Sequence, residues 1–426
     1  PTRILVTTAH LAAFSGSEVL AIDVARYYRS QGAQVTIATN YIDHTIGDAV
    51  PDGIHLIDNI DACELSNFDL VWCQHSLVGL YGWRPLRALA DAGKMPLITL
   101  VTLSRRERLE AVDVTLAKVL GGLILCNSPV TQLHTQRQFA NDRGGSIISF
   151  NNAPLNEFWR VRALRSKYSR TSGELKHVTA ISNHPPPELL AALALLEEAG
   201  VEVRRIGRDH EYKLVDPTVF EQTDAVVSIG RSVHFALAAG VPAYVYDHFG
   251  GDGWLTPSNV ALNHKYNFTG RPRNRRLDAS AIVREICDGY PAAVHDMSAI
   301  LATPEVRDLR LERWLDGLLE LAKDRDQQLL RSKEAGEALD SRSARTHLAV
   351  LRLSQQSTRR RSRGEHPVST AVADPLLRAA LKLSEGVWGG LATWSPAPVT
   401  NSPPFGSFGP NRLAVSAREV FAGSPS

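Results

Sequence analysis

Residues 228–259 read SIGRSVHFALAAGVPAYVYDHFGGDGWLTPSN. A strand-like run ends at a glycine, a short apolar helical stretch follows, and the apolar strand PAYVYD comes next. This order of strand, glycine turn, helix and strand is typical of a βαβ unit in a parallel sheet. Aromatic residues and three glycines then gather in 247–254, which is more than a plain strand end needs. We therefore expect a binding loop at 247–254.

The same alternation of strands and helices covers most of the chain. Six apolar runs in the first part predict strands: RILVTT, QVTIATN, DLVWCQ, PLITLVT, LILCNS and SIISFNN. A helix is predicted over 17–32, with Ser17 as N-cap and Gly32 as stop. The pattern restarts with HVTAIS, VEVRRIG, DAVVSIG and PAYVYD, separated by predicted helices over 187–199 and 232–239. Apolar strands alternating with helices predict an α/β fold of two Rossmann-like, doubly wound domains that face a cleft.

Composition changes mark the expected domain boundaries. The first domain is predicted over 1–159, a polar basic linker over 160–176, and the second domain over 177–337. Residues 303–324 predict an amphipathic closing helix that packs back onto the body. The remainder, 338–426, is basic and rich in Pro, Gly and Ser, so we expect a mobile tail with one short amphipathic helix over 375–388.

The overall composition excludes several classes of protein. A formal net charge of +2 in 426 residues gives no reason to expect nucleic acid as a partner. No apolar run is long enough for a membrane span, and the chain begins directly with a predicted strand, so we expect a cytoplasmic protein without a signal peptide. The four cysteines are scattered, and no spacing typical of a metal site or disulfide framework appears.

Ligands of open parallel sheets bind at the carboxyl ends of strands, which makes the strand ends candidate sites. In the first domain, Gly16 and Ser17 begin a helix, where exposed amides suit an anion or a sugar hydroxyl. Ser17 could equally serve only as a helix cap. His75, just past DLVWCQ, could orient a substrate or act as a general base, or it could be a satisfied structural histidine.

In the second domain, Asn183 and His184 precede three prolines that stiffen their loop, which favours a pre-organised ligand contact. Gly230, Arg231 and Ser232 form a strand-to-helix turn that could bind a phosphate through backbone amides and the guanidinium group.

The loop over 247–254 offers further groups to a nucleotide. Asp247 could accept hydrogen bonds from ribose hydroxyls. Phe249 or Trp254 could stack on a base or a sugar, although either ring could equally be packing.

At these residues the sequence resembles bacterial GT-B glycosyltransferases of surface-polysaccharide synthesis, of the group 1 type. The blocks ISNHPP, SIGRSVHFALAAGVPAYVYDHFGGDGWL and NFTGR carry most of the resemblance, and SGSE and WCQHS extend it over about residues 1–335. The resemblance implies a nucleotide-sugar donor held by the second domain and a saccharide or lipid-linked acceptor against the first. It also implies that the enzyme needs neither a catalytic metal nor another cofactor.

The strand-end residues, taken together with the resemblance, lead to a set of expected roles. Asn183, Gly230, Arg231, Ser232, Asp247, His248, Gly250 and Gly251 are expected to bind the donor, Gly16 and Ser17 an acceptor or phosphate, and His75 and His184 to be catalytic. One departure is visible: Phe235 stands where many retaining members have a second glutamate. Asp247 is the conjectural substitute for that ribose anchor, and retention or inversion stays open.

Two other functions fit the same pattern. A nucleotide-sugar epimerase of the same fold would form product without an acceptor. A non-catalytic nucleotide- or saccharide-binding protein would bind its ligand without turnover. The missing glutamate favours this second alternative. The basic residues 359–363, next to the predicted helix over 375–388, could also hold the protein peripherally on an anionic membrane.

Overall fold

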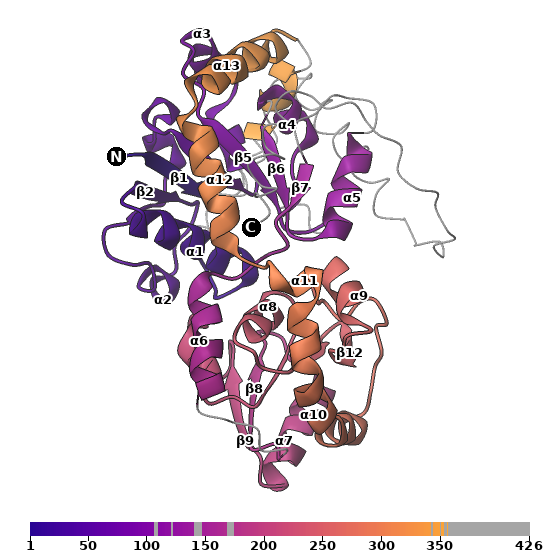
Figure 1. Ribbon diagram of the computed structural model, residues 1–426. Coiled ribbons are helices and arrows are strands. Elements are labelled where there is room, and N and C mark those ends of the chain that lie inside the picture. Colours follow the sequence, from indigo (N-terminus) through magenta and orange to yellow (C-terminus); the bar gives the residue numbers. More distant parts are fainter. Residues whose placement is uncertain are drawn as a thin grey trace, which may run out of the picture.

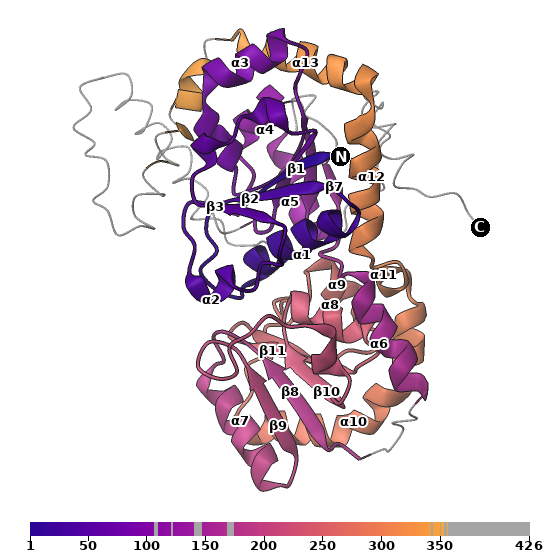
Figure 2. The ribbon, with the colours of Figure 1, turned by 90° about the vertical axis from the view of Figure 1, so that its left-hand side faces the viewer.

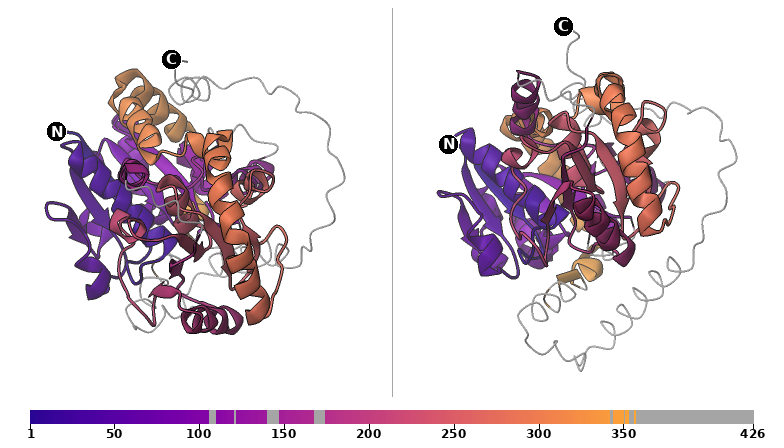
Figure 3. Two further views of the ribbon diagram at one scale, coloured as in Figure 1. Left: turned by 60° about the horizontal axis from the view of Figure 1, so that its bottom comes forward. Right: turned by 90° about the horizontal axis from the view of Figure 1, so that it is seen from below.

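A computed structural model describes residues 1–105, 110–120, 122–139, 147–167, 174–341, 344–349, 351–352 and 356. Its two domains are stacked end to end (Figure 1), and they lie largely one behind the other when seen from below (Figure 3). Each domain has its own sheet with helices on both faces. The expected α/β fold with two Rossmann-like domains, the GT-B arrangement, is therefore confirmed.

The first domain is built on a seven-stranded parallel sheet in the order β3-β2-β1-β4-β5-β6-β7. Its strands are β1 (Arg3–Thr7), β2 (Gln34–Ala38), β3 (His55–Ile57), β4 (Leu70–Gln74), β5 (Leu97–Thr102), β6 (Leu123–Cys126) and β7 (Ile147–Ser149). Its helices are α1 (Gly16–Ser30), α2 (His44–Gly47), α3 (Trp83–Asp91), α4 (Val114–Leu120) and α5 (Pro129–Gln138), with short 3-10 turns at Ile60–Ala62, Leu65–Asn67 and Leu77–Tyr81. The sequence pattern missed β3, because a three-residue strand with no fully buried side chain carries little periodicity.

The second domain has a five-stranded sheet in the order β12-β11-β10-β8-β9. The strands are β8 (His177–Ile181), β9 (Glu202–Ile206), β10 (Ala225–Ser228), β11 (Ala243–Asp247) and β12 (Gly250–Trp254). Helices α7 (Pro187–Glu198), α8 (Arg231–Ala238), α9 (Val260–Lys265), α10 (Ala279–Ala302) and α11 (Pro304–Arg307) accompany them, with η4 at Pro217–Phe220.

The glycine-rich stretch expected as a loop is an antiparallel strand. Gly250 pairs with Asp247 and Trp254 with Tyr244, so β11 and β12 form a hairpin. A Cβ at Gly251 would lie 2.0 Å from the Val245 carbonyl oxygen, so close strand packing requires glycine there. The glycines of this stretch therefore serve the hairpin.

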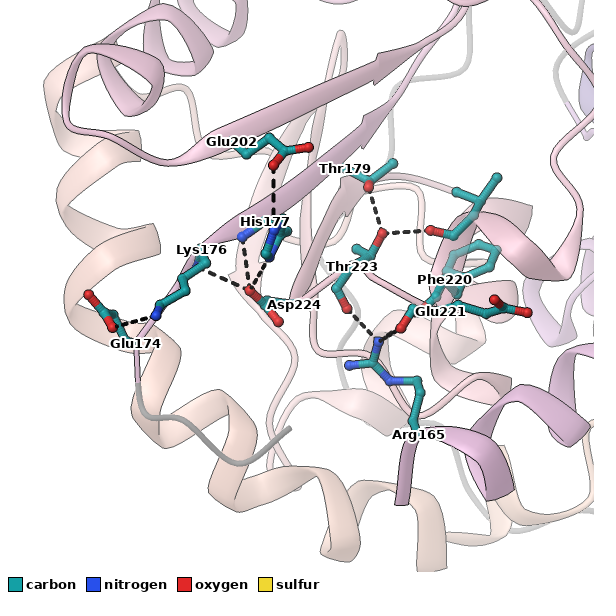
Figure 4. A network of polar contacts seen from close by, with 11 residues as sticks. Arg165, Glu174, Lys176, His177, Thr179, Glu202, Phe220, Glu221, Thr223 and Asp224 are labelled. Atoms are coloured by element: carbon teal, nitrogen blue, oxygen red, sulfur yellow. Dashed lines mark hydrogen bonds and ion pairs between the residues drawn. The ribbon is translucent and has the colours of Figure 1, made fainter. Parts of the chain in front are cut away.

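The stretch expected as a linker is largely helical. Residues 160–167 belong to α6 (Asn156–Lys167). Arg165 Nη1 donates hydrogen bonds to the carbonyl oxygens of Phe220 and Thr223, both at 2.6 Å, and so fixes α6 to the second domain. Figure 4 shows this contact beside Asp224, which accepts from the backbone amides of Lys176 and His177 where β8 begins.

The closing helix packs on the body as expected, but on the first domain. The segment breaks after α11 and continues as α12 (Leu311–Lys323) and α13 (Arg325–Leu339), which run along the first domain in Figure 2. Tyr28 Oη donates to the Leu315 carbonyl oxygen at 3.0 Å, and Trp83 Nε1 donates to that of Leu339 at 2.8 Å. The boundary expected at 337 is therefore corrected: the chain leaves the second domain after α11.

The start of the expected tail is also packed. Ala344 and Leu348 are buried in the core of the first domain, where they belong to the same apolar cluster as Leu77, Leu80 and Leu339. The basic run 359–363 and the predicted helix over 375–388 lie outside the described residues. Within the described residues, no helix combines the length and hydrophobicity that a membrane span requires.

Candidate functional site

A pocket of about 370 Å³ lies between the two domains at the carboxyl ends of strands from both sheets. The first domain contributes the segments after β1, β5, β6 and β7, and the second contributes those after β8, β9, β10 and β11. Its wall includes Gly16, Ser17, Asn183, His184, Gly230, Arg231, Ser232, Asp247 and His248, all of them predicted site residues. Parallel strands end on one edge of a sheet, which is why separate segments converge here.

Contacts through Phe14 fix one side of the pocket. Its backbone amide donates to Tyr212 Oη at 3.2 Å, and its carbonyl oxygen accepts from Asn183 Nδ2 at 3.0 Å. The rings of Phe14 and Tyr212 lie 5.0 Å apart. Asn183, a predicted donor-binding residue, therefore also ties the two domains together. Sequence reasoning did not predict Phe14, which directly precedes SGSE, or Tyr212 as site residues.

The N-terminus of α1 is already occupied by a carboxylate. Ser15, not Ser17, is the N-cap residue, which corrects the expected start of this helix. Ser17 Oγ donates to Glu18 Oε2 at 3.0 Å, and Ser15 Oγ bonds the same oxygen. Burial raises the pKa of Glu18, while bonds from the backbone amides of Glu18, Ala12 and Ala13 oppose that rise. A helix N-terminus that holds a carboxylate is poorly suited to a phosphate, so the surface at Gly16 suits a hydroxyl better.

The N-terminus of α8 is open by contrast. Gly230 is its N-cap, with φ of 62°, and makes no side-chain cap bond. A Cβ at Gly230 would meet nothing within 4 Å, and the first turn contains no acidic residue. The Val233 amide donates to the Gly230 carbonyl oxygen at 3.2 Å, but the amides of Arg231 and Ser232 have no acceptor within the helix. These two amides and the helix dipole are therefore available to an anion beside the Ser232 side chain.

The guanidinium group of Arg231 is directed to the other domain. Its Nη2 donates to Asp23 Oδ2 of α1 at 2.7 Å, and both side chains are buried. Its Nε and Nη1 are buried as well and have no partner among the described residues. Burial lowers the pKa of Arg231, which the nearby Asp23 carboxylate opposes. This side chain therefore forms an ion pair across the interface, and its expected contact with a phosphate stays a prediction.

Asp247 organises the rim of the pocket. It accepts hydrogen bonds from Ser182 Oγ at 2.8 and 2.9 Å and from the His248 amide at 2.8 Å. Ser182 Oγ in turn accepts from the His184 amide at 3.0 Å, and the rings of His184 and His248 approach edge to face at 6.2 Å. Because Asp247 is almost fully buried in these bonds, it holds the two histidine loops in place.

His75 lies outside the pocket. It is only 3% exposed, and its Nδ1 accepts from the Ala9 amide at 2.8 Å. Burial, with a smaller contribution from His10, lowers the pKa of His75 to about 3. A general base must reach its substrate, so the expected catalytic role is corrected: His75 supports the loop after β1.

Gly250, Gly251 and Trp254 also lie away from the pocket. The two glycines are buried in the β11–β12 hairpin. Trp254 Nε1 donates to the Glu285 carbonyl oxygen at 2.9 Å, and its ring packs beside Tyr244 and Tyr290. The donor-binding role expected for the glycines is therefore corrected to a structural one.

Sequence reasoning missed several polar residues of the wall. Glu110, Asn127, Asn152, Lys213 and Asn267 all line the pocket. They come from segments far apart in the chain, so no local signal groups them. Asn267 is the first residue of the block NFTGR, which carried part of the resemblance but was not predicted as a site residue. Among the described residues, His, Cys, Asp and Glu form no group of three that could hold a metal ion.

No known protein family matches this sequence, and no curated protein matches it either. Among solved structures, an alpha-glucosyltransferase in complex with UDP and a 13-mer DNA is 9% identical, with a TM-score of 0.38 over 79% of this chain and 94% of that chain. MurG of Acinetobacter baumannii is 13% identical, with a TM-score of 0.33 over 82% and 99%. The glycosyltransferase SnogD from Streptomyces nogalater is 13% identical, with a TM-score of 0.36 over 75% and 99%.

Proposed function

We propose that this protein is a glycosyltransferase of bacterial surface-polysaccharide synthesis that moves a sugar, such as a hexose, from a nucleotide-sugar donor to a saccharide or lipid-linked acceptor. One observation carries the proposal: the interdomain pocket places the open N-terminus of α8 opposite a polar wall from the first domain. Such a pocket can hold a phosphate-linked donor and a hydroxyl acceptor at the same time, which supplies proximity and excludes water.

The leaving phosphate is assigned to the start of α8. Negative charge develops on the departing diphosphate in the transition state, and fixed amide dipoles stabilise such charge without reorganisation. Ser232 and the amides of the first turn supply these dipoles. We propose that no resident metal or other cofactor is needed, because the helix N-terminus provides positive potential where the charge appears. EDTA should therefore leave turnover unchanged.

Glu110 is the proposed general base for the acceptor hydroxyl. Among the described residues of the pocket wall, the acidic side chains are Glu110 and Asp247, and only Glu110 belongs to the first domain. Asp247 already accepts hydrogen bonds from two donors of its own domain, the Ser182 hydroxyl and the His248 amide. Glu110→Gln should lower turnover by about 10²-fold or more while donor affinity stays unchanged. Unchanged turnover would exclude this role.

A substitution at Ser232 tests the phosphate site. Ser232→Asp places a carboxylate at the start of α8, where it competes with phosphate, so nucleoside diphosphate affinity should fall at least about tenfold. Ser258→Asp makes the same change at an exposed serine of the same domain that does not line the pocket, and it should have no effect. Calorimetry with UDP, GDP, ADP and TDP measures both. If no diphosphate binds the wild-type protein, the proposed function is wrong.

A non-catalytic binding protein is the second candidate. Phe235 stacks on Phe158 of α6 with ring centroids 4.2 Å apart, so an aromatic contact replaces the acid that many retaining enzymes have there. Nucleotide and saccharide binding without any turnover would favour this reading.

Peripheral membrane contact through residues 338–426 is also proposed, because their basic residues would attract anionic lipid. Liposome flotation of the full chain, compared with a chain ending at 356, tests it. Equal binding of both to anionic liposomes at low salt would exclude the contact.

A further inference from the structure

Two asparagines from different domains meet in the wall of the pocket. Asn152 follows β7 of the first domain, and Asn267 follows α9 of the second. Asn152 Nδ2 donates to Asn267 Oδ1 at 3.4 Å. His234 of α8 contacts the same oxygen through Nε2 at 3.0 Å. Since a carbonyl oxygen only accepts, Nε2 of His234 carries the hydrogen.

This arrangement leaves one acceptor and one donor unused. Asn267 Oδ1 is satisfied twice, while Asn152 Oδ1 and Asn267 Nδ2 have no partner among the described residues. Neither atom is among the fully buried unpaired atoms, although Asn152 as a whole is only 6% exposed, and both residues line the pocket. The pair therefore presents a carbonyl oxygen next to an amide NH₂ group.

His234, which contacts the pair directly, is neutral, and the nearby charge that acts on it is Arg231, which is paired with Asp23. Burial lowers the pKa of His234 to about 3, and the neighbouring His264 adds to that shift. At pH 7 His234 is therefore uncharged, and its bond to Asn267 fixes the amide without adding charge. Nearby Asn127, also in the wall, is buried and has an Oδ1 atom with no partner among the described residues. Neutral amides in this number suit hydroxyl groups better than ions.

Backbone conformation offers a competing explanation for the asparagines. Asn152 has φ of 48° and Asn267 of 55°, a left-handed conformation that asparagine tolerates better than most residues. Glycine would serve that conformation equally well, however, and would leave no amide in the pocket. Conformation therefore explains the backbone but not the contact between the side chains.

We propose that Asn152 and Asn267 together bind two adjacent hydroxyl groups of a neutral sugar. One hydroxyl donates to Asn152 Oδ1, and the oxygen of its neighbour accepts from Asn267 Nδ2. A bound sugar would thereby bridge the two domains. The inference rests on the proposed function for the role of that sugar, which is either the donor's sugar or the acceptor.

Glycine and aspartate substitutions distinguish the contribution of the Asn267 side chain to binding from that of its backbone conformation. Asn267→Gly keeps the left-handed conformation and removes the amide, and Asn267→Asp keeps the shape but replaces the NH₂ donor with an acceptor. Asn274→Gly is the matched control, because Asn274 has φ of 50°, is exposed and does not line the pocket. Circular dichroism and thermal unfolding establish that each variant is folded.

Three affinities are measured for each variant: nucleoside diphosphates, the corresponding nucleotide sugars, and the saccharides of a glycan array with nucleotide present and absent. We expect both Asn267 variants to weaken saccharide binding about five- to tenfold, as the loss of one or two hydrogen bonds predicts, with diphosphate affinity and the control unchanged. Weaker nucleotide-sugar binding assigns the pair to the donor sugar, and weaker array binding assigns it to the acceptor.

The two proposals fail in different ways. Unchanged saccharide affinity in folded Asn267→Gly and Asn267→Asp proteins overturns the inference, even if nucleotide binds and turnover proceeds. A wild-type protein that binds neither a nucleotide sugar nor an array saccharide overturns it too. Saccharide binding that depends on Asn267 without any nucleotide binding supports the inference and contradicts the proposed function.

Discussion

Arg231, the first residue of α8, donates a hydrogen bond to Asp23 of α1 at 2.7 Å and thereby joins the two domains through a buried ion pair. Asp23 also accepts from Arg26 Nη2 at 2.9 Å, and Arg26 reaches Glu157 of α6. The network includes the first residue of α8. The position of that helix against the first domain therefore depends on a charge contributed by the other domain.

Removing one partner of this pair should be strongly destabilising. Asp23→Ala leaves the Arg231 guanidinium buried without its partner, which costs about 3–5 kcal/mol. Arg204→Ala is the control, since the Arg204–Glu211 pair is exposed and should contribute at most about 1 kcal/mol. Urea unfolding followed by fluorescence measures both. The double variant Asp23→Leu, Arg231→Met should recover most of the lost free energy of unfolding. If Asp23→Ala costs no more than Arg204→Ala, the pair between Asp23 and Arg231 is not the stabilising contact described.

His75 should affect stability in acid rather than the pH dependence of turnover. Its pKa is about 3 in the folded protein and near its ordinary 6.5 when unfolded, so only the unfolded chain takes up the proton between these values. The free energy of unfolding is therefore unaffected by this histidine above about pH 6.5, and it falls as the pH drops from 6.5 toward 3. His234 and His264, with pKa values of about 3 and about 4, act in the same window.

The test for His75 is the variant His75→Asn, which tolerates the left-handed backbone at this position. The urea midpoint of the variant should depend less steeply on pH between 6.5 and 3 than that of the wild type. A turnover loss of about 10²-fold in the folded variant at neutral pH would instead restore the role of general base.

The glycines of the pocket and of the hairpin should respond differently to alanine. In Gly251→Ala the new Cβ would lie 2.0 Å from the Val245 carbonyl oxygen, so the hairpin must distort, at a cost of about 1–3 kcal/mol or more. A Cβ at Gly16 meets nothing within 4 Å, and Gly16→Ala should change stability by no more than about 0.5 kcal/mol. Thermal unfolding compares the two. Equal melting temperatures would show that β12 does not pack as described.

The segment after α13 should be needed for stability. Leu348 is fully buried in the first domain, so Leu348→Ala should cost about 2–5 kcal/mol, whereas Leu329→Ala, at a leucine 60% exposed on α13, should cost little. A chain ending at 340 should melt lower than one ending at 356, because it uncovers the surface under Leu348. Identical melting of the two shortened chains would mean that this packing contributes nothing.

The sequence by itself determined the two sheets and most of their strands. Continuous apolar runs such as LVWCQ and AYVYD are buried at every position, and burial on both faces is a local property that composition records. It also determined that Ser232 and Asp247 lie at strand ends, and hence on one edge of a sheet. What it could not determine is which way a side chain at such an edge turns.

Tertiary structure decided that direction, because it depends on partners distant in the chain. Arg231 turns to Asp23, 208 residues away, and His75 turns to the Ala9 amide, 66 residues away. The strand β12 forms because its glycines let it approach β11 and Arg275 closely, although glycine disfavours strands locally. Asn152 and Asn267 meet only because the two domains fold and dock, so neither local sequence could predict their contact.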